Sequence, residues 1–225
     1  GTSVTLAKAG AGTLTLSGAN TYTGATTVSS GILTAGVSTV GTASGAFGVG
    51  SNITINGGTV ALGAYNESVG TVTIGTNGGS ITGSGGILTA TTSYTFNNDS
   101  GHTASITAIL AGSGVTLTQA GAGTTTLTGV NTYTGTTTIS AGTLKLANTS
   151  GTTLPTTAAI SMTGSSGSAA TLDLAGYSQT IASLNSATAT YNTVTNSGVS
   201  SNAVLTIGGA SPGSFAGIIQ NGTST

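Results

Sequence analysis

The stretch VTLAKAGAGTLTLSGANTYTGATTVSSGILTAG, residues 4–36, occurs a second time as VTLTQAGAGTTTLTGVNTYTGTTTISAGTLKLA, residues 115–147. The copies lie 111 positions apart, and 21 of their 33 aligned residues are identical. Such identity within a chain of 225 residues indicates an internal duplication. We therefore expect a single continuous fold built of two homologous units, residues 1–111 and 112–225.

Within each copy, hydroxyl and aliphatic side chains alternate between glycine and asparagine, as in Thr13-Leu14-Thr15-Leu16. Alternation with a period of two predicts short strands with one buried face, and no sustained spacing of three and four residues predicts a helix. A flexible linker would lack such regularly placed β-branched and aliphatic residues. The chain is therefore expected to be all-β.

Three all-β architectures remain open, namely a sandwich, a barrel and a parallel β-solenoid. Sandwiches and barrels normally carry charge on their outer faces, whereas only 2% of this chain is charged. In a solenoid like residues stack on like, which favours Thr, Val, Ile, Asn and Gly in strands broken by Gly or Asn corners. We favour a β-solenoid of roughly 8 to 11 coils, at about 20 to 29 residues each.

The composition also excludes several partners and cofactors. The charged side chains are few, and they are Lys8, Lys145, Glu67, Asp99 and Asp173. Two lysines cannot provide a phosphate-binding surface, so no nucleic-acid partner is expected. Apolar runs are too short for a membrane-spanning helix, and the absence of Cys removes thiolate metal sites. Gly10 and Gly12 are interpreted as coil corners, because no Lys follows to form a phosphate loop. No cofactor or metal is expected.

The few ionisable residues allow two catalytic arrangements to be considered. Asp99 and His102, with one of the many serines, contain the residue types of a Ser-His-Asp triad. A lone His in the polar stretch NNDSGHTAS is more often a solvated turn residue. A pair of carboxylates for glycoside hydrolysis would need two of Glu67, Asp99 and Asp173 close together. Because Glu67 and Asp173 lie in corresponding parts of different units, we expect them to be far apart, and we expect no enzyme.

The polar residues that stand out are Asn20 and Tyr22 in the first NTYTG motif, and Asn131 and Tyr133 in the second. We interpret each Asn as a structural ladder or corner residue whose amide satisfies backbone groups across stacked coils, with ligand contact as the alternative. Each Tyr is expected to cover a coil corner, with carbohydrate stacking as the alternative. Asn-x-Ser/Thr triplets are expected by chance in so Ser- and Thr-rich a chain and are not taken as glycosylation sites.

The motifs carry a family resemblance. GAGTLTLSGANTYTGATTVSSGIL, residues 10–33, and GAGTTTLTGVNTYTGTTTISAGTL, residues 121–144, resemble the β-strand repeat associated with autotransporter passenger domains of Gram-negative bacteria. LDLAGYSQTIASL, residues 172–184, is similar to the segment that precedes such a repeat, and FAGIIQNGT, residues 215–223, to its lead-in. The resemblance implies a right-handed parallel β-helix, secreted and displayed at the cell surface, and implies no catalytic activity.

The two ends of the chain suggest self-assembly. In the family pattern the lead-in directly precedes the GxGTLTLSG run, yet here it lies at the carboxy terminus, so the end followed by the beginning reads as one repeat. Open end coils expose unpaired backbone groups, and a net charge of −1 gives little repulsion. A head-to-tail contact that does not close yields a filament. The candidate assembly residues are Val4, Leu6, Phe215, Ile218 and Ile219.

Two functions follow from these patterns. The first is an extracellular structural protein whose subunits assemble head to tail into a surface or matrix filament, so that its main partner is itself. The alternative is a stalk segment of an autotransporter adhesin passenger, with host or cell surfaces as partners. Because the chain starts at Gly1 without Met, we take it as a processed form or a segment of a longer protein. Both functions place it outside the cell or at its surface.

Overall fold

The computed structural model describes residues 3–150, 152–198 and 202–222, and the regular structure in these ranges is entirely β. The strands are two to five residues long and are separated by turns and bends. All pairings between them are parallel. Parallel neighbours joined through short corners, with no helix between them, define a chain that coils on itself.

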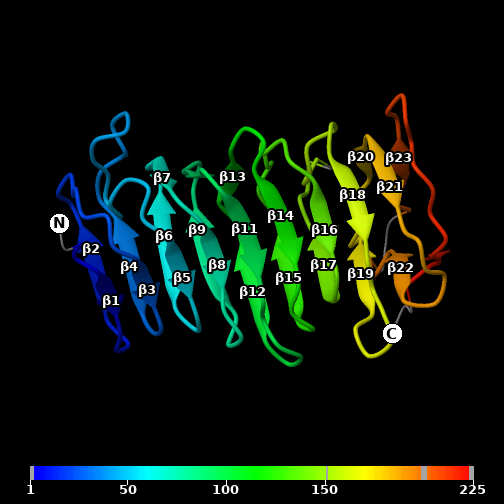
Figure 1. Ribbon diagram of the computed structural model, residues 1–225, viewed down its shortest axis with the longest axis horizontal. Coiled ribbons are helices and arrows are strands. Elements are labelled where there is room, and N and C mark those ends of the chain that lie inside the picture. Colours follow the sequence, from blue (N-terminus) through cyan, green and yellow to red (C-terminus); the bar gives the residue numbers. More distant parts are fainter. Residues whose placement is uncertain (1–2, 151, 199–201, 223–225) are drawn as a thin grey trace.

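Two long sheets form the sides of the coil, and Figure 1 shows their strands side by side from the amino-terminal end to the carboxy-terminal end. In spatial order, the nine strands of the first sheet are β1 (Leu6–Lys8), β3 (Thr26–Val28), β5 (Ile53–Ile55), β8 (Val72–Ile74), β11 (Ser93–Phe96), β14 (Thr116–Gln119), β16 (Thr137–Ile139), β18 (Ala159–Met162) and β21 (Ser183–Asn185). The ten strands of the second sheet are β2 (Thr13–Leu16), β4 (Ile32–Ala35), β6 (Thr59–Gly63), β9 (Gly79–Gly83), β12 (Thr103–Ile106), β15 (Thr124–Leu127), β17 (Gly142–Leu146), β19 (Ala170–Asp173), β22 (Asn192–Thr195) and β24 (Ile218–Ile219).

The third side of the coil carries two smaller sheets. The third sheet contains β7 (Glu67–Val69), β10 (Ile87–Ala90) and β13 (Ile109–Ala111), and the fourth contains β20 (Gln179–Ile181) and β23 (Leu205–Ile207). The prediction of an all-β parallel solenoid is confirmed. The ten strands of the second sheet correspond to about ten coils, within the range of roughly 8 to 11 expected from repeat lengths.

The core is built of rows in which each coil places a similar side chain over the one before. In the first sheet Val28 is in register with Ile55, and Ile55 with Ile74. In the second sheet Leu33 is in register with Val60. All five are buried, and burying each such side chain contributes about 1.5–3 kcal/mol. This stacking explains why the alternation in the sequence is so regular, since every strand must present the same face to the interior.

Glycines let the corners of successive coils approach closely. Gly142 has a φ of 63°, and a Cβ at this position would lie 2.3 Å from the Gly123 carbonyl oxygen and 2.4 Å from that of Gly121. Gly31, the equivalent residue of the first copy, has a φ of 67°, and a Cβ at this position would lie 2.4 Å from the carbonyl oxygens of Gly10 and Gly12. In both copies, therefore, the carbonyl groups of the GAG run contact a glycine of the following coil. That glycine directly precedes β4 in the first copy and begins β17 in the second.

This contact predicts the effect of a single methyl group. Gly142→Ala should lower the free energy of unfolding by about 2 to 4 kcal/mol, because it adds a steric clash to the strain of a positive φ. Gly101 is a matched control, since its φ is 86° but a Cβ there meets no atom within 4 Å. Gly101→Ala should therefore lose only about 1 to 2 kcal/mol. Equal losses in urea titrations of both variants would contradict the proposed contact.

Candidate functional site

The NTYTG motif forms the same corner in both copies, leading from β2 to β3 and from β15 to β16. In each corner the closing glycine packs on the backbone of the preceding coil. Gly24 N donates to Val4 O at 3.1 Å, and Gly135 N donates to Val115 O at 3.0 Å. A Cβ would lie 2.2 Å from Val4 O or 2.4 Å from Val115 O, so the backbone contact requires glycine.

Asn131 joins three successive coils through its amide. The side chain is only 3% exposed, and its Oδ1 accepts a hydrogen bond from Leu110 N at 2.9 Å. Its Nδ2 donates to Thr153 O at 2.9 Å, and its backbone N donates to the same oxygen at 3.1 Å. Leu110 belongs to the coil before and Thr153 to the coil after. The amide therefore satisfies buried backbone groups that the strand ladders leave unpaired.

Asn20 makes the related contact in the first copy, at a more accessible position. Its Nδ2 donates to Ala46 O at 2.8 Å and to Gly18 O at 3.0 Å. Its backbone exchanges two hydrogen bonds with Gly45. Both asparagines thus bind a long connection in the following coil. We name these connections the first excursion, residues 36–52 between β4 and β5, and the second excursion, residues 147–158 between β17 and β18.

Each tyrosine of the motif bonds to the threonine four residues later. The Tyr22 hydroxyl lies 2.7 Å from Thr26 Oγ1, and the Tyr133 hydroxyl lies 2.7 Å from Thr137 Oγ1. Both threonines are fully buried and occupy inward positions of the first sheet. A buried hydroxyl without a partner is costly, so the tyrosine makes a threonine tolerable in an otherwise aliphatic row.

The two tyrosines differ in their surroundings. Tyr133 is fully buried and packs on Tyr94, with ring centroids 6.2 Å apart and planes tilted by 53°. Burial raises the pKa of the Tyr133 hydroxyl above its ordinary value, and the hydrogen bond to Thr137 offsets part of that rise. Tyr22 is half-buried and lies against Gly48 of the first excursion, where a Cβ would come within 3.0 Å of the ring. Because Tyr133 is fully buried, it has no exposed face on which a ligand could stack.

The first excursion projects beyond the sheets, as the blue loop near the amino-terminal end of Figure 1 shows. Its tip is a tight hairpin in which Val40 N donates to Ser44 O at 2.9 Å, and Val40 is 67% exposed. Its base is anchored, because Thr39 N donates to Asn66 O at 2.8 Å and Phe47 is fully buried. The excursion is thus a fixed protrusion with an uncharged tip.

Glu67 lies beneath this excursion and is only 2% exposed. Its Oε2 accepts hydrogen bonds from Thr39 Oγ1 at 3.1 Å and from Phe47 N at 3.4 Å, while its Oε1 is buried and has no hydrogen-bond partner among the described residues. Burial raises the pKa of the Glu67 carboxyl above its ordinary 4.5, although hydrogen bonds from Thr39, Phe47 and Ala46 oppose that rise. The Glu67 charge also contributes to a raised pKa of Tyr22, after burial as the main cause.

Lys8 occupies the position that Gln119 holds in the second copy, and both point inward. The Lys8 ammonium donates to the carbonyl oxygens of Ala9, Gly10 and Ser30 at 3.2, 2.7 and 3.0 Å. Gln119 Nε2 donates to Gly121 O at 2.7 Å and Gly123 O at 3.5 Å. Either side chain therefore supplies donors to the carbonyl groups of the glycine corner, which is a structural task.

Asp173 is the third buried charged residue, after Lys8 and Glu67. Its Oδ2 accepts a hydrogen bond from Ser197 Oγ at 2.6 Å and lies 3.8 Å from Lys145 Nζ. Its Oδ1 accepts from the backbone N of Ala175 and of Ser197, both at 2.9 Å. These bonds fix the connection that follows β22 onto the turn that follows β19, so the carboxylate acts as a backbone clamp.

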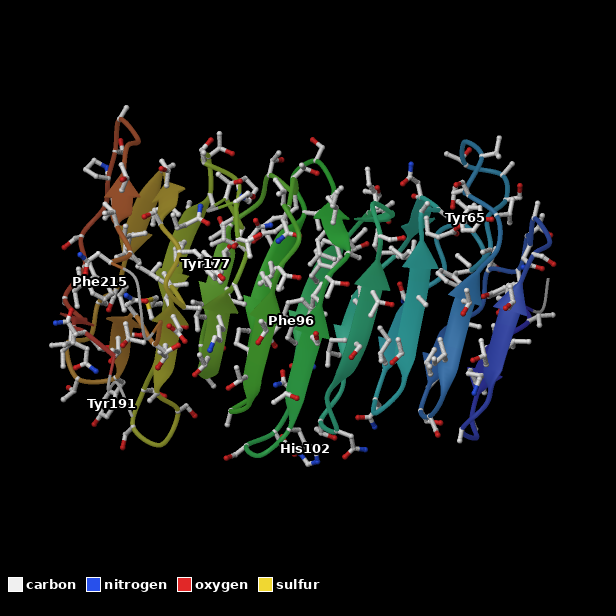
Figure 2. All side chains as sticks on the ribbon, turned by 180° about the vertical axis from the view of Figure 1, so that it is seen from behind. Tyr65, Phe96, His102, Tyr177, Tyr191 and Phe215 are labelled. Atoms are coloured by element: carbon white, nitrogen blue, oxygen red, sulfur yellow. The ribbon has the colours of Figure 1, made fainter. Side chains whose placement is uncertain are left out.

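The residues weighed for catalysis do not form a reactive cluster. His102 and Asp99 are in contact through their backbones, with His102 N donating to Asp99 O at 2.9 Å, and both are exposed. Figure 2 shows His102 in a turn at the margin of the solenoid. Glu67 lies on the third sheet and Asp173 on the second. Within the described ranges, no three His, Cys, Asp or Glu side chains come together where they could hold a metal.

The candidate assembly residues lie at the two end coils. Val4 and Ile219 are 69% and 66% exposed, and Ile218 is also exposed. Leu6 and Phe215 are partly buried and pack against the core. In the part of the chain that the structure describes, no helix is both long and apolar enough to cross a membrane.

Sequence reasoning missed several asparagines that act as staples between coils. Asn52 Oδ1 accepts from Thr71 N at 2.8 Å, Asn66 Oδ1 accepts from Ile87 N at 3.0 Å, and the buried Asn98 donates through Nδ2 to Thr124 O at 3.0 Å. Each of these residues begins an Asn-x-Ser/Thr triplet. Asn52 and Asn66 stand directly before β5 and β7, and Asn98 lies two residues after β11, at corners where backbone groups lack a ladder partner.

Together these features define a parallel β-solenoid whose corners are held by buried amides and which carries two anchored excursions. Residues 6–35 and 117–146 each match the family described as Passenger-associated-transport-repeat. The chain therefore carries two copies of this autotransporter passenger repeat, and the predicted family resemblance is confirmed. The NTYTG corner lies within both matched segments.

A curated relative supports the same family. The chain is 37% identical over 194 residues to the adhesin BmaC autotransporter of Brucella suis biovar 1 (strain 1330). That alignment covers 78% of this chain and 5% of the adhesin, so the chain corresponds to a small part of that protein. No solved structure matches the chain significantly.

The buried amide of the second corner predicts a loss of stability on substitution. Asn131→Leu should lower the free energy of unfolding by about 1 to 3 kcal/mol, because Leu110 N loses its acceptor inside the protein. The same change at the more accessible Asn20 is the control and should cost less. Chemical denaturation of both variants checks the order, and an unchanged stability for Asn131→Leu would contradict the assigned contacts.

The buried carboxyl predicts a pH dependence. Because the pKa of Glu67 is raised in the folded state, its contribution to stability is fully present below the ordinary pKa and is lost as the pH rises through the folded pKa. Glu67→Gln keeps an acceptor for Thr39 and removes the ionisation. The variant should be more stable than the original protein at neutral pH and lack this decline. Denaturation midpoints measured from acid to neutral pH test it, and parallel profiles for both proteins would refute it.

Proposed function

We propose that the chain is a stalk segment of an autotransporter adhesin passenger and acts as a structural spacer, not as an enzyme. The observation that carries the proposal is the continuity of the two long sheets, which run through nine and ten strands. Such a stack transmits load from coil to coil through backbone hydrogen bonds. The similarity to an adhesin autotransporter supports a place at the surface of a Gram-negative bacterium, facing host or other cell surfaces.

The local geometry suits this role. The corner asparagines and the NTYTG corners tie each coil to its neighbours, so that the stalk keeps one register along its length. The first excursion stands out from the side without interrupting the sheets on either side of it. A spacer can therefore carry protrusions at fixed positions, and binding functions commonly reside on such loops.

Head-to-tail assembly into an extracellular filament is the second candidate function. It rests on the exposed apolar side chains of the end coils, above all Val4 and Ile219. Parallel strands at an open edge present unpaired N–H and C=O groups, which pair readily with another strand. Under this candidate the protein is its own partner.

Electron microscopy of the purified chain over a dilution series separates the two candidates. A stalk segment should give single rods about 43 Å long at every concentration, from nine steps of about 4.8 Å between ten stacked strands. Long filaments that Ile219→Lys dissolves, while Val130→Lys on the side of the stack does not, would overturn the stalk role and support the filament. Particles without an elongated shape would contradict both candidates.

A further inference from the structure

The outward face of the first sheet carries an unbroken row of hydroxyl groups. The penultimate residue of each strand of this sheet from β3 to β18 points to solvent and is in register with the next. Thr27 is exposed and the others are partly exposed, and together they cover seven successive coils. The row consists of Thr27, Thr54, Thr73, Thr95, Thr118, Thr138 and Ser161.

A second row of hydroxyls runs beside the first over four coils. It lies two residues earlier in the sequence, at the first residue of β11 and β14, where Ser93 is in register with Thr116, and directly before β8 and β16. The members are Thr71, Ser93, Thr116 and Thr136, all of them accessible to solvent. The hydroxyls thus form a two-dimensional array, with repeats of about 4.8 Å between coils and about 6.6 Å along the chain direction of the strands.

The array is fixed in position. Threonine is β-branched and has few χ1 rotamers, so that its hydroxyl and its methyl group are held in place by the backbone. The backbone is held in turn by buried residues on the inward side, such as Val72, Ile74 and Leu117. Figure 1 shows neighbouring strands of this sheet with little change of direction between coils. The face is therefore a preorganised and nearly flat lattice.

The chemistry of the face limits what it can bind. In the described part of the first sheet the outward residues are uncharged, because the one charged residue in these strands, Lys8, points inward. Charged partners find no complement there. The aromatic residues of the sheet, Tyr94 and Phe96, are also fully buried, and Figure 2 shows Phe96 within the body of the solenoid. The face thus lacks aromatic platforms on which sugar rings could stack.

We propose that this face binds the surface of ice. Each hydroxyl both donates and accepts a hydrogen bond, and the adjacent methyl group restricts where water can lie. Fixing one water costs about 0–2 kcal/mol, but a rigid array holds many waters at once and at regular intervals. A crystal of water repeats in two directions at distances of the same size, so that it can engage the whole array, whereas a small ligand engages one or two hydroxyls.

The second sheet provides an internal comparison. One of its outward rows also consists of threonines in register, but it covers five coils where the row of the first sheet covers seven: Thr103, Thr124, Thr143, Thr171 and Thr193. The row beside it runs through Ser80, Ser105 and Thr126 and then continues to Lys145 and Asp173. Charged groups bind liquid water strongly and break the repeat. We therefore assign binding to the first sheet, and the second sheet supplies control positions.

The test is ice affinity of the purified chain, measured as the fraction of protein incorporated into slowly grown ice and as inhibition of ice recrystallisation. The original protein should be incorporated and active. The triple variant Thr73→Lys, Thr95→Lys, Thr118→Lys should lose both properties. Matched substitutions on the second sheet, at Thr103, Thr124 and Thr143, should leave them unchanged. Circular dichroism before freezing confirms that the variants are folded, and Thr95→Lys alone serves as a milder change.

Three results would overturn the proposal: exclusion of the original protein from ice, equal losses in the variants of both sheets, or adsorption to crystalline cellulose without any effect on ice. The last would assign the face to neutral polysaccharides. The proposal goes beyond the stalk role, and the two can fail separately. Single rods in the microscope would uphold the stalk even if ice binding were absent.

Discussion

The structure depends on one constraint, namely that each coil can hydrogen-bond only to the coil before it and the coil after it. Strand ladders satisfy this constraint along the sides, but every corner leaves backbone N–H and C=O groups without a regular partner. Asparagine amides fill these gaps between coils, as Asn131 does between Leu110 and Thr153. Where coils approach most closely, glycine replaces any larger residue. The composition of the chain follows from these two needs as much as from the strands.

The same constraint gives the few charged residues unusual positions. Lys8, Glu67 and Asp173 are buried, and each bonds to backbone groups of a corner or an excursion. They serve as strong donors or acceptors where a corner departs from the common pattern. Glu67 supports the longest excursion, and Asp173 fixes a late turn. The long faces that remain are almost free of charge, which makes the hydroxyl rows their main chemical feature.

Sequence reasoning reached the fold because the period of two and the duplication both reflect the stacked strands directly. It also singled out the NTYTG motif, since identical polar residues in both copies stand out from the positions around them that differ between the copies. The staples Asn52 and Asn66 could not be assigned in the same way, because a corner amide bonds to a coil about 20 residues away, and that register is set only in three dimensions. The burial of Glu67 depends on the folded first excursion, whose shape no periodic pattern encodes.

The offset of 111 residues has a geometric meaning that the strand order makes visible. A shift of 111 residues leads from β1 to its equivalent, β14. In the first sheet β14 lies five strands beyond β1, which corresponds to about 24 Å along the solenoid axis. Each repeat also delivers one anchored excursion to the same side of the stack. Gain or loss of a whole 111-residue unit would therefore preserve the stacking of the coils. It would move all coils beyond that unit along the axis by about 24 Å. Recombination between repeats can therefore lengthen or shorten such a solenoid in equal steps without a new fold.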